Sequence, residues 1–482
     1  MSQIKDLEPG KLWSIFYDLT QIPRPSKSEQ KAVEFARAYG EKLGLETIRD
    51  KTGNVIIKKP PMPGCEKKPG IILQAHLDMV PQKNSDIDHD FEKDPIQAFI
   101  DGEWVTAKGT TLGADNGIGV AAALSVMASK DIQHGPVEAL LTIDEETGMT
   151  GAFNLEAGIL EGKILINLDS EDEGELYIGC AGGVNTSARF NYINKPVPDG
   201  MKGFKVSVSG LKGGHSGLDI HLGRGNSNQL LFRFMYNAFK KYGLRLSEVD
   251  GGSLRNAIPR ESYAIVTVPE KFEAGFLESV DEYRKIFTAE LGSVEPDLAF
   301  GAEPVKLPRL VIDRDIQKNL IKSVYGLPNG VIRMSPEMPG VVETSSNLAI
   351  VKSGKDHIEV LCLLRSSVDS AKDSLARSIQ CVFELAGAEV IHDGDYPGWK
   401  PDVDSNVLAT MKEVYNKKFG KVPEVKVIHA GLECGIIGDV YKGLDMISFG
   451  PTIRFPHSPD EKVNIETVKK FWEFLVSTLE SM

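Results

Sequence analysis

Cysteine is scarce in this sequence, and no two cysteines are spaced as a CxxC pair. The five cysteines are widely scattered: Cys65, Cys180, Cys362, Cys381 and Cys434. Their odd number and spacing predict reduced thiols, as in a cytoplasm, and exclude a disulfide framework and a zinc site of paired thiolates. Any metal ion must therefore be bound by histidine and carboxylate side chains.

Long apolar runs and an excess of basic charge are also missing. No stretch of about 18 consecutive apolar residues occurs, and the N-terminus, MSQIKDLEPGKLWSIF, lacks the basic and apolar segments of a secretory signal. The sequence has 55 Lys and Arg residues against 68 Asp and Glu residues, a net charge of −13. A protein that binds nucleic-acid phosphates carries a basic excess. We therefore expect a cytoplasmic protein that binds neither nucleic acid nor membranes.

In other respects the composition is that of a soluble globular protein. Of the 482 residues, 41% are hydrophobic and 26% are charged, which is enough to bury a large core. The length is roughly two to three times that of an average domain, so we expect two domains or one domain with a large insertion.

Short apolar runs in the first part of the chain each end in polar residues. Residues 70–75 end at His76, residues 137–143 at Asp144-Glu145-Glu146, and residues 163–168 at Asp169. Runs of this length predict buried strands, and the small apolar segment 117–127 predicts a buried helix between them. Alternating strands and helices predict an α/β fold, with a sheet covered by helices on both faces. Ligands of such sheets bind beyond the carboxyl ends of the strands, where these polar residues lie.

The pattern changes near residue 185. Residues 184–192 and 203–208 alternate between apolar and polar, as half-exposed antiparallel strands do, and a helix-like stretch follows at 229–242. We therefore predict an α+β module at 185–395, inserted into a first domain that comprises residues 1–184 and 396–482. The segment 393–399 is predicted to be a turn-rich return to the first domain.

Two histidines and several acids lie where metal ligands are expected. His76 and Asp78 project to the same side of an extended segment, and a ligating histidine commonly needs a carboxylate to orient its ring. Asp115 lies in a tight turn before the predicted buried helix, and His457 lies in a proline-framed loop. The side chains of the adjacent Glu145 and Glu146 must diverge, so that one can bind metal while the other faces a water molecule.

Each of these residues alone has a simpler structural interpretation. A lone histidine is more often a hydrogen-bonded structural residue, and an acid at a strand end is usually a solvated cap. The combination is more specific, because two histidines and three carboxylates suit a pair of divalent first-row ions, typically zinc. One further carboxylate beside the metals would supply a general base.

The order of these motifs resembles the co-catalytic zinc peptidases of family M20. The resemblance rests on residues 76–81 (HLDMVP), 113–117 (GADNG), 144–146 (DEE), 168–170 (LDS) and the late His457, which span the whole chain. Residues 180–183 (CAGG), 213–217 (GGHSG) and 254–259 (LRNAIP) further resemble one subgroup, the bacterial aminoacyl-histidine dipeptidases, also called Xaa-His or cytosol non-specific dipeptidases.

This resemblance assigns roles in a metal centre. Asp115 would bridge two divalent ions, most typically zinc, with manganese or cobalt also tolerated by the ligand set. His76 and Asp169 would complete one metal site, and Glu146 and His457 the other. Asp78 would orient His76, and Glu145 would be the general base for a metal-bridging water, the nucleophile. The resemblance also implies a cis peptide between Asp115 and Asn116.

The inserted module corresponds, by the same resemblance, to the family's lid. On it, His215 would polarise the scissile carbonyl, and Asn256 and Arg365 would hold the C-terminal carboxylate of the substrate. The resemblance further suggests a homodimer.

Glu433 and Cys434, in a glycine-rich loop, fit a role as loop scaffold as well as substrate contact, and the role of His429 stays open. His89 and His134 lie in polar stretches and are expected to be solvated.

We therefore predict a cytoplasmic di-zinc dipeptidase that hydrolyses unblocked dipeptides, Xaa-His and β-alanyl-histidine types among them, with broad specificity. One alternative is an aminoacylase-type N-acyl amino acid amidohydrolase, which would use the same metal site without binding a free α-amine. A distant alternative is a non-catalytic ligand-binding homologue, which the presence of Glu145 and all five expected ligands disfavours.

Residues 117–122 (GIGVAA) fit a loose dinucleotide-binding pattern, but a polar loop precedes them instead of a strand. We interpret these glycines as sites of close helix–sheet packing.

Overall fold

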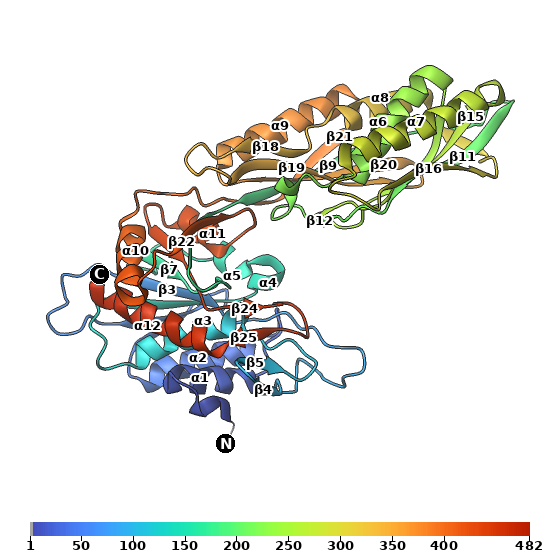
Figure 1. Cartoon of the computed structure of the whole chain (residues 1–482). Helices are drawn as coiled ribbons and strands as arrows, with labels where there is room; N and C mark the ends of the chain where they lie inside the picture. The colour runs from blue at the N-terminus through green and yellow to red at the C-terminus, as the bar shows by residue number, and fades with distance from the viewer. Residues whose placement is uncertain (1–2) are drawn as a thin grey trace. The chain divides into compact units, whose positions relative to one another are not determined.

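The computed structural model describes residues 3–482, which form two compact units (Figure 1). Among these described residues, the first unit comprises residues 3–180, Trp399–Val427 and Leu432–Met482. The second comprises Ala181–Gly398 together with the short segment Ile428–Gly431. No helix among the described residues combines the length and the apolarity needed to cross a membrane.

The first unit is built on an eight-stranded mixed sheet. In spatial order its strands are β1 (Glu46–Arg49), β2 (Val55–Lys59), β6 (Val137–Thr142), β3 (Ile71–His76), β7 (Ile164–Asn167), β23 (Asp445–Ser448), β8 (Glu175–Cys180) and β22 (Glu424–Ile428). Strands β6, β3, β7 and β23 run parallel, whereas β1, β2 and β8 pair antiparallel with their neighbours. The four parallel strands therefore end at one edge of the sheet.

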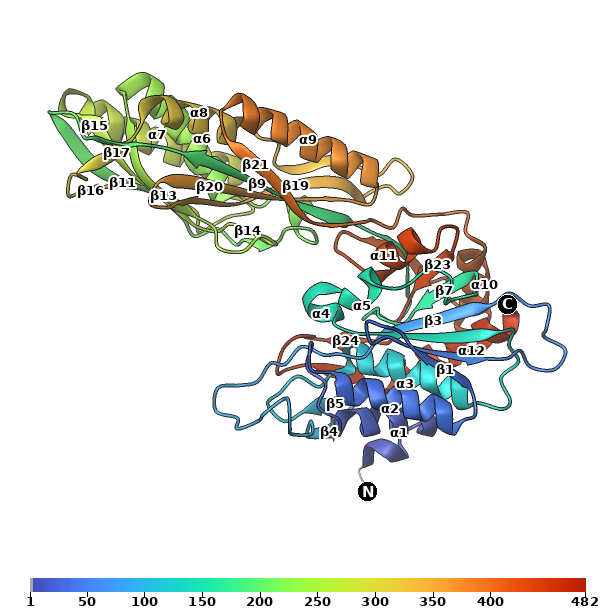
Figure 2. The ribbon, with the colours of Figure 1, turned by 180° about the vertical axis from the view of Figure 1, so that it is seen from behind.

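Helices cover both faces of this sheet. Figures 1 and 2 show α1 (Gly10–Thr20), α2 (Gln30–Lys42) and α3 (Ala114–Ala128) on one face, and α10 (Asn406–Phe419) and α11 (Glu433–Val440) on the other. The C-terminal helix α12 (Ile465–Ser481) packs against α10. Helix α3 is apolar on all sides and almost wholly buried, as a helix between a sheet and further helices must be.

Small elements complete the first unit near the carboxyl ends of the parallel strands. Strand β6 is followed by the one-turn helices α4 (Glu145–Gly148) and α5 (Thr150–Phe153). A second sheet joins β24 (Ile453–Arg454), β25 (Lys462–Asn464), β5 (Trp104–Ala107) and β4 (Ala98–Asp101). Pairing of β25 with β5 brings the loop 455–461 beside the segment that leads into α3.

The second unit is a layer of helices on one antiparallel sheet. The strands are β16 (Ala299–Val305), β11 (Met201–Ser209), β15 (Ser262–Pro269), β13 (Arg245–Gly251), β19 (Val342–Ser353), β20 (His357–Ser366), β9 (Gly182–Asn191) and β21 (Glu389–Tyr396), with β18 (Gly330–Met334) on β19. Helices α6 (Ser227–Tyr242), α7 (Glu273–Leu291), α8 (Arg314–Gly326) and α9 (Asp369–Leu385) cover one face (Figures 1 and 2).

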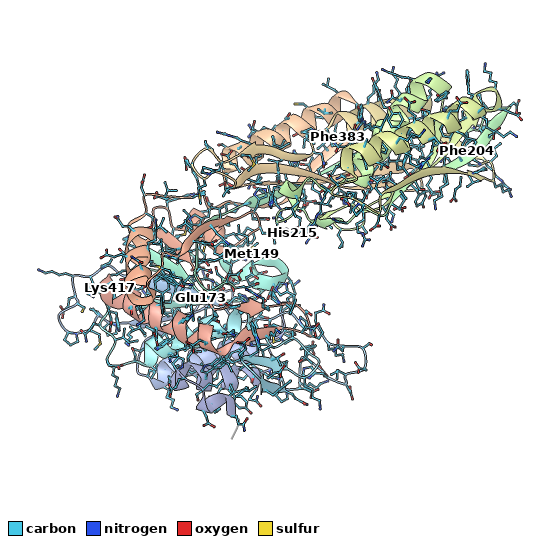
Figure 3. The ribbon with its side chains drawn as sticks, in the orientation of Figure 1. Met149, Glu173, Phe204, His215, Phe383 and Lys417 are labelled. Atoms are coloured by element: carbon cyan, nitrogen blue, oxygen red, sulfur yellow. The ribbon has the colours of Figure 1, made fainter. Side chains whose placement is uncertain are left out.

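An aromatic core holds these helices to the sheet. Phe204 and Phe383, labelled in Figure 3, are fully buried, and their rings contact Phe276 and Phe190 at centroid distances of 5.1 and 5.9 Å. The short strands β12 (Gly214–His215) and β14 (Ala257–Ile258) pair with each other on the opposite side of the sheet. Strand β10 (Asn194–Pro196) pairs with β17 (Leu310–Ile312).

The predicted α/β class with a mixed sheet between helices is confirmed, but two local predictions are wrong. Residues 393–396 continue the edge strand β21 instead of forming a turn. His89 and His134 are buried, at 8% and 0% exposure. Their polar sequence neighbours suggested solvation, but His134 Nδ1 lies 2.6 Å from the Gly135 carbonyl oxygen and the His89 ring packs edge-on against Phe91.

Candidate metal centre

The parallel strands of the first unit deliver polar side chains to one edge of the sheet. Strand β3 ends at His76, β6 leads into the Glu145–Gly148 turn, and β7 leads into Asp169. Asp115 stands at the start of α3, and its peptide bond to Asn116 is cis, as the family resemblance implied. Residues that are distant in sequence meet here because parallel strands share their carboxyl edge.

Five of the predicted site residues form one cluster, with Asp115 at its centre. His76 Nε2 lies 3.2 Å from Asp115 Oδ1 and 3.3 Å from Asp169 Oδ1. His457 Nε2 lies 3.1 Å from Asp115 Oδ2 and 3.0 Å from Glu146 Oε2. Each oxygen of Asp115 thus faces a different imidazole, and each imidazole faces one further carboxylate. Ligand atoms of His76, Asp115 and Glu146 all lie within 4.8 Å of one another.

The protonation of this cluster reflects its negative charge. Hydrogen bonds to Asp115 and Glu146 raise the pKa of His457 to about 11. The pKa of His76 is well above its usual value, because Asp169 and Asp115 outweigh burial, which alone would lower it. Burial raises the pKa of Asp169 to about 7, helped by Asp115 and Glu146. Without metal, the cluster therefore binds protons, and the same negative charge would stabilise divalent cations.

The donor set fits divalent metal ions. Imidazole nitrogens and carboxylate oxygens are the ligands that zinc and related ions prefer. Glu146 Oε1 is buried without a hydrogen-bond partner among the described residues. An unpaired buried carboxylate oxygen is costly, and a bound cation would satisfy it.

Asp78 lies behind the cluster and connects two of its segments. Its Oδ1 is 3.4 Å from His76 Nδ1 and accepts the Glu145 N–H at 3.0 Å. Its Oδ2 accepts the Glu146 N–H at 3.2 Å and the Ser26 hydroxyl at 2.7 Å. Burial alone would raise the pKa of Asp78, but these hydrogen bonds and His76 lower it to about 2. Asp78 therefore stays ionised and can orient the His76 ring.

Glu145 differs from the five clustered residues because its carboxylate takes part in none of their ion pairs. Burial, with Asp169, Glu433 and Glu146 nearby, raises its pKa well above the usual value. A carboxylate with a raised pKa beside a metal site is suited to take and return a proton.

Glu433 and Cys434 are both buried, at 1% and 0% exposure. Glu433 Oε2 accepts hydrogen bonds from Gln74 Nε2 at 2.6 Å and from Thr142 Oγ1 at 2.7 Å. These bonds tie the start of α11 to strands β3 and β6, which supports the scaffold interpretation of this loop.

In the second unit, His215 lies on β12, and its protonation is defined by the backbone around it. The side chain of His215 is labelled in Figure 3. The N–H groups of Gly217 and Leu218 donate to His215 Nδ1 at 3.1 and 3.0 Å, so the ring proton is on Nε2. Burial lowers the pKa of His215 to about 4, and the nearby Arg365 adds to this shift. At neutral pH His215 is therefore an uncharged imidazole whose Nε2–H is available to donate.

Arg365, Asn256 and His429 belong to the same unit as His215. Arg365 is buried on β20 and donates to the Tyr396 hydroxyl at 2.8 Å. Asn256 is exposed, and its carbonyl accepts the Ser216 N–H at 2.8 Å. His429, in the segment that returns to this unit, is buried with Nε2 2.8 Å from Ser345 Oγ. Arg365 therefore lies near His215, whereas the Asn256 contact with Ser216 is made by its backbone carbonyl.

Two buried charged residues beside the cluster were not predicted from the sequence. Arg24 and Glu461 are each 2% exposed, and they bind mainly backbone groups of the loops that carry Asp78 and Asp115. Backbone partners leave no signature in the residue types, so a motif search cannot identify such contacts.

Comparisons with known proteins identify the family of this chain. The model of peptidase family M20/M25/M40 matches residues 72–481. The cytosol non-specific dipeptidase of Escherichia coli (strain K12) is 45% identical over 482 residues, which is 100% of this chain and 99% of that protein. The crystal structure of aminoacylhistidine dipeptidase from Vibrio alginolyticus has a TM-score of 0.95 and 51% identity, and the match covers 100% of this chain and 98% of that chain.

The aminopeptidase PepT from Bacillus cereus is more distant, with a TM-score of 0.63 at 19% identity over 98% of this chain and 99% of that chain, and it supports the fold alone. The family match covers most of the chain, and it includes every clustered residue described above. The chain therefore belongs to peptidase family M20/M25/M40.

Proposed function

We propose that this protein is a metal-dependent dipeptidase that hydrolyses unblocked dipeptides, Xaa-His and β-alanyl-histidine types among them, in the cytoplasm. The observation that carries the proposal is the cluster in which His76 and His457 face opposite oxygens of Asp115. The names of the two most similar relatives reported above, a dipeptidase in each case, support the substrate class. None of the five cysteines, all of which lie in the described part of the chain, forms a disulfide, and the name of one of these relatives contains the word cytosol; both support the location.

Two divalent ions, zinc in the first place and manganese or cobalt as substitutes, are the proposed cofactors. His76 and Asp169 would hold one ion, Glu146 and His457 the other, and Asp115 would bind both. When bound, such ions supply Lewis acidity: they acidify water and polarise a carbonyl oxygen.

The Glu145 carboxylate is the proposed general base. Its half-buried position and raised pKa favour proton uptake from the attacking water. The same carboxyl group would then deliver that proton to the leaving amine. Asp78 would keep the His76 ring in a fixed orientation through the 3.4 Å contact with Nδ1.

Three residues of the second unit are proposed to act on the substrate. His215 has an uncharged Nε2–H, which suits a hydrogen bond to the developing oxyanion. The Arg365 guanidinium suits the substrate's C-terminal carboxylate, because an arginine can donate two parallel hydrogen bonds to it. Asn256 is proposed as a second carboxylate contact. In this view residues 185–395 are the lid, residues 1–184 and 396–482 are the catalytic domain, and the protein is a homodimer.

A panel of dipeptides tests the proposed substrate class. The purified protein, loaded in turn with Zn²⁺, Mn²⁺ or Co²⁺, is assayed on free and N-acetylated dipeptides of the same sequence. We expect hydrolysis of the free dipeptides and loss of activity on their acetylated forms. Activity restricted to N-acyl substrates would contradict the proposal and indicate the aminoacylase-type alternative, and no hydrolysis with any metal would indicate a non-catalytic relative.

A further inference from the structure

Glu461 follows His457 in the loop between β24 and β25, and it is 2% exposed. The next residue, Lys462, begins β25 and pairs with Thr106 of β5. This pairing fixes the Glu461 backbone beside the segment that leads into α3. The Glu461 side chain is thereby directed at the loop that carries Asp115.

The Glu461 carboxylate accepts four backbone hydrogen bonds from that loop. Its Oε2 accepts the N–H groups of Leu112 and Gly113 at 2.8 and 2.9 Å. Its Oε1 accepts the N–H groups of Ala114 and Asp115 at 2.7 and 3.2 Å. Ala114 and Asp115 are the first two residues of α3, where N–H groups have no partner within the helix, and Leu112 and Gly113 directly precede them. One carboxylate thus binds the N–H groups of four successive residues.

These bonds connect two of the residues that face each other in the cluster. Glu461 binds the backbone N–H of Asp115, while Asp115 Oδ2 lies 3.1 Å from His457 Nε2. His457 and Glu461 belong to one short loop. This loop therefore contacts both the backbone of Asp115, through Glu461, and the side chain of Asp115, through His457. A shift of Glu461 would therefore displace Asp115 and His457 relative to each other.

Arg24 holds the opposite side of the same loop. Its Nη2 donates to the Gly113 carbonyl at 2.5 Å, and its Nη1 donates to the carbonyls of Leu77 and Asp78 at 3.0 and 2.8 Å. Gly113 has a left-handed φ of 72°, and a Cβ atom there would lie 2.5 Å from Arg24 Nη2. The loop is thus held from two sides by buried charged groups.

We infer that Glu461 is a positioning residue of the proposed metal centre, which sets the distance between Asp115 and His457 without touching either metal. The inference rests on the proposed function, since it requires that these side chains bind cations. Groups that orient metal ligands typically contribute about 10–100-fold to metal affinity. Glu461 would act through its four hydrogen bonds to the backbone of residues 112–115.

The test is Glu461→Gln in the full-length protein. The glutamine side chain keeps one acceptor oxygen but turns an NH₂ group toward two backbone N–H groups, so at least two hydrogen bonds are lost. We expect the Kd for Zn²⁺, measured by competition with a chromophoric chelator, to rise by about 10-fold or more. We also expect the increase in melting temperature that Zn²⁺ produces to become smaller than in the unmodified protein.

Glu138→Gln is the matched control. Glu138 is 4% exposed in the same unit, and its Oε2 accepts the backbone N–H groups of Glu161 and Gly162 at 2.9 and 2.8 Å, away from the cluster. This variant should lower the melting temperature of the metal-free protein and leave the Kd for Zn²⁺ unchanged. If Glu461→Gln does not fold, Glu461→Asp, which keeps the charge but shortens the reach, takes its place with the same expected result.

The outcomes separate this inference from the proposed function. If the unmodified protein binds no Zn²⁺, the proposed metal centre fails and the inference fails with it. If the unmodified protein binds Zn²⁺ and the Glu461 variant has the same Kd, with only a lower melting temperature as in Glu138→Gln, the positioning role alone is overturned.

Discussion

At the scale of single residues, the carboxylate of Asp115 faces both imidazoles of the cluster, and Glu145 stands apart from these pairs. This separation divides the acids into those that would bind metal and one that would move a proton. The division follows from local structure, because Glu145 and Glu146 begin a helical turn and their side chains leave it in different directions.

Glu145→Gln tests the proton-transfer role. The amide cannot accept a proton from water, so kcat for a free dipeptide should fall by about 10²–10⁴-fold. Metal content, measured by elemental analysis, should stay at the unmodified level, because Glu145 takes part in none of the ion pairs of the cluster. Glu161→Gln, at an acid whose side chain is 80% exposed in the same unit, is the control and should keep full activity. A Glu145 variant with unchanged kcat would contradict the role.

Metal affinity should depend on pH. In the metal-free protein the pKa of His457 is raised to about 11 and that of His76 is raised as well, so both imidazoles are protonated at pH 7. A metal ion needs the unprotonated nitrogen, so binding must release protons. Affinity should therefore rise with pH, by about ten-fold per pH unit for each proton released. Titration calorimetry in two buffers of different ionisation enthalpy measures the release, and equal heats in both would contradict it.

The predicted ligands could be found from sequence because acids and histidines at the ends of buried runs leave a readable pattern. His76, Asp169 and the Glu145–Glu146 pair each follow such a run. Glu461 could not be found in this way, because its partners are backbone N–H groups that every residue but proline carries. The burial of His134 was missed for a similar reason, since its partner is a backbone carbonyl.

At the scale of elements, helix α3 packs closely on the sheet through glycine. A Cβ atom at Gly119 would lie 2.6 Å from the Leu168 carbonyl oxygen, at the end of β7. Asn116 Nδ2 donates to the same oxygen at 2.7 Å. Gly119 of the dinucleotide-like pattern therefore serves helix–sheet packing, whereas a Cβ atom at Gly117 would lie 3.1 Å from the Phe16 ring of α1, so that glycine allows helix–helix packing.

Gly119→Ala should destabilise the protein because the added methyl group meets backbone in a packed core. We expect the free energy of unfolding to fall by about 1–3 kcal/mol, measured by urea denaturation. Gly326→Ala is the control, since that glycine ends α8 with no atom within 4 Å of an added Cβ. The control should be neutral or stabilise by up to about 1 kcal/mol. Equal effects of the two substitutions would contradict the packing role of Gly119.

The edge strand β21 shows where element prediction failed. It pairs with β9 on one side only, most of its residues are exposed, and its register shifts between Asp393 and Tyr396. Such a strand lacks the alternation of a half-buried strand, and its Asp-Gly-Asp-Tyr-Pro-Gly sequence is typical of turns. By contrast, the buried strands β3, β6 and β7 were predicted because both of their faces are apolar.

At the scale of the whole molecule, the chain leaves its first unit after Cys180 and returns to it at Trp399. The change from continuous apolar runs to alternating strands indicated this insertion. The return of Ile428–Gly431 to the second unit was not predicted, because four residues carry too little pattern. This return places His429 beside Ser345, in the same unit as His215 and Arg365.

In the proposed metal centre, side chains from residue 76 to residue 457 form one cage for two cations that share Asp115. Anomalous X-ray diffraction at the zinc edge, on crystals of the zinc-loaded protein, would locate both cations. We expect two anomalous peaks about 3.5–4 Å apart, one beside His76 and Asp169 and one beside Glu146 and His457, each with an Asp115 oxygen as ligand. A single peak, or two peaks without Asp115 between them, would exclude the shared cage.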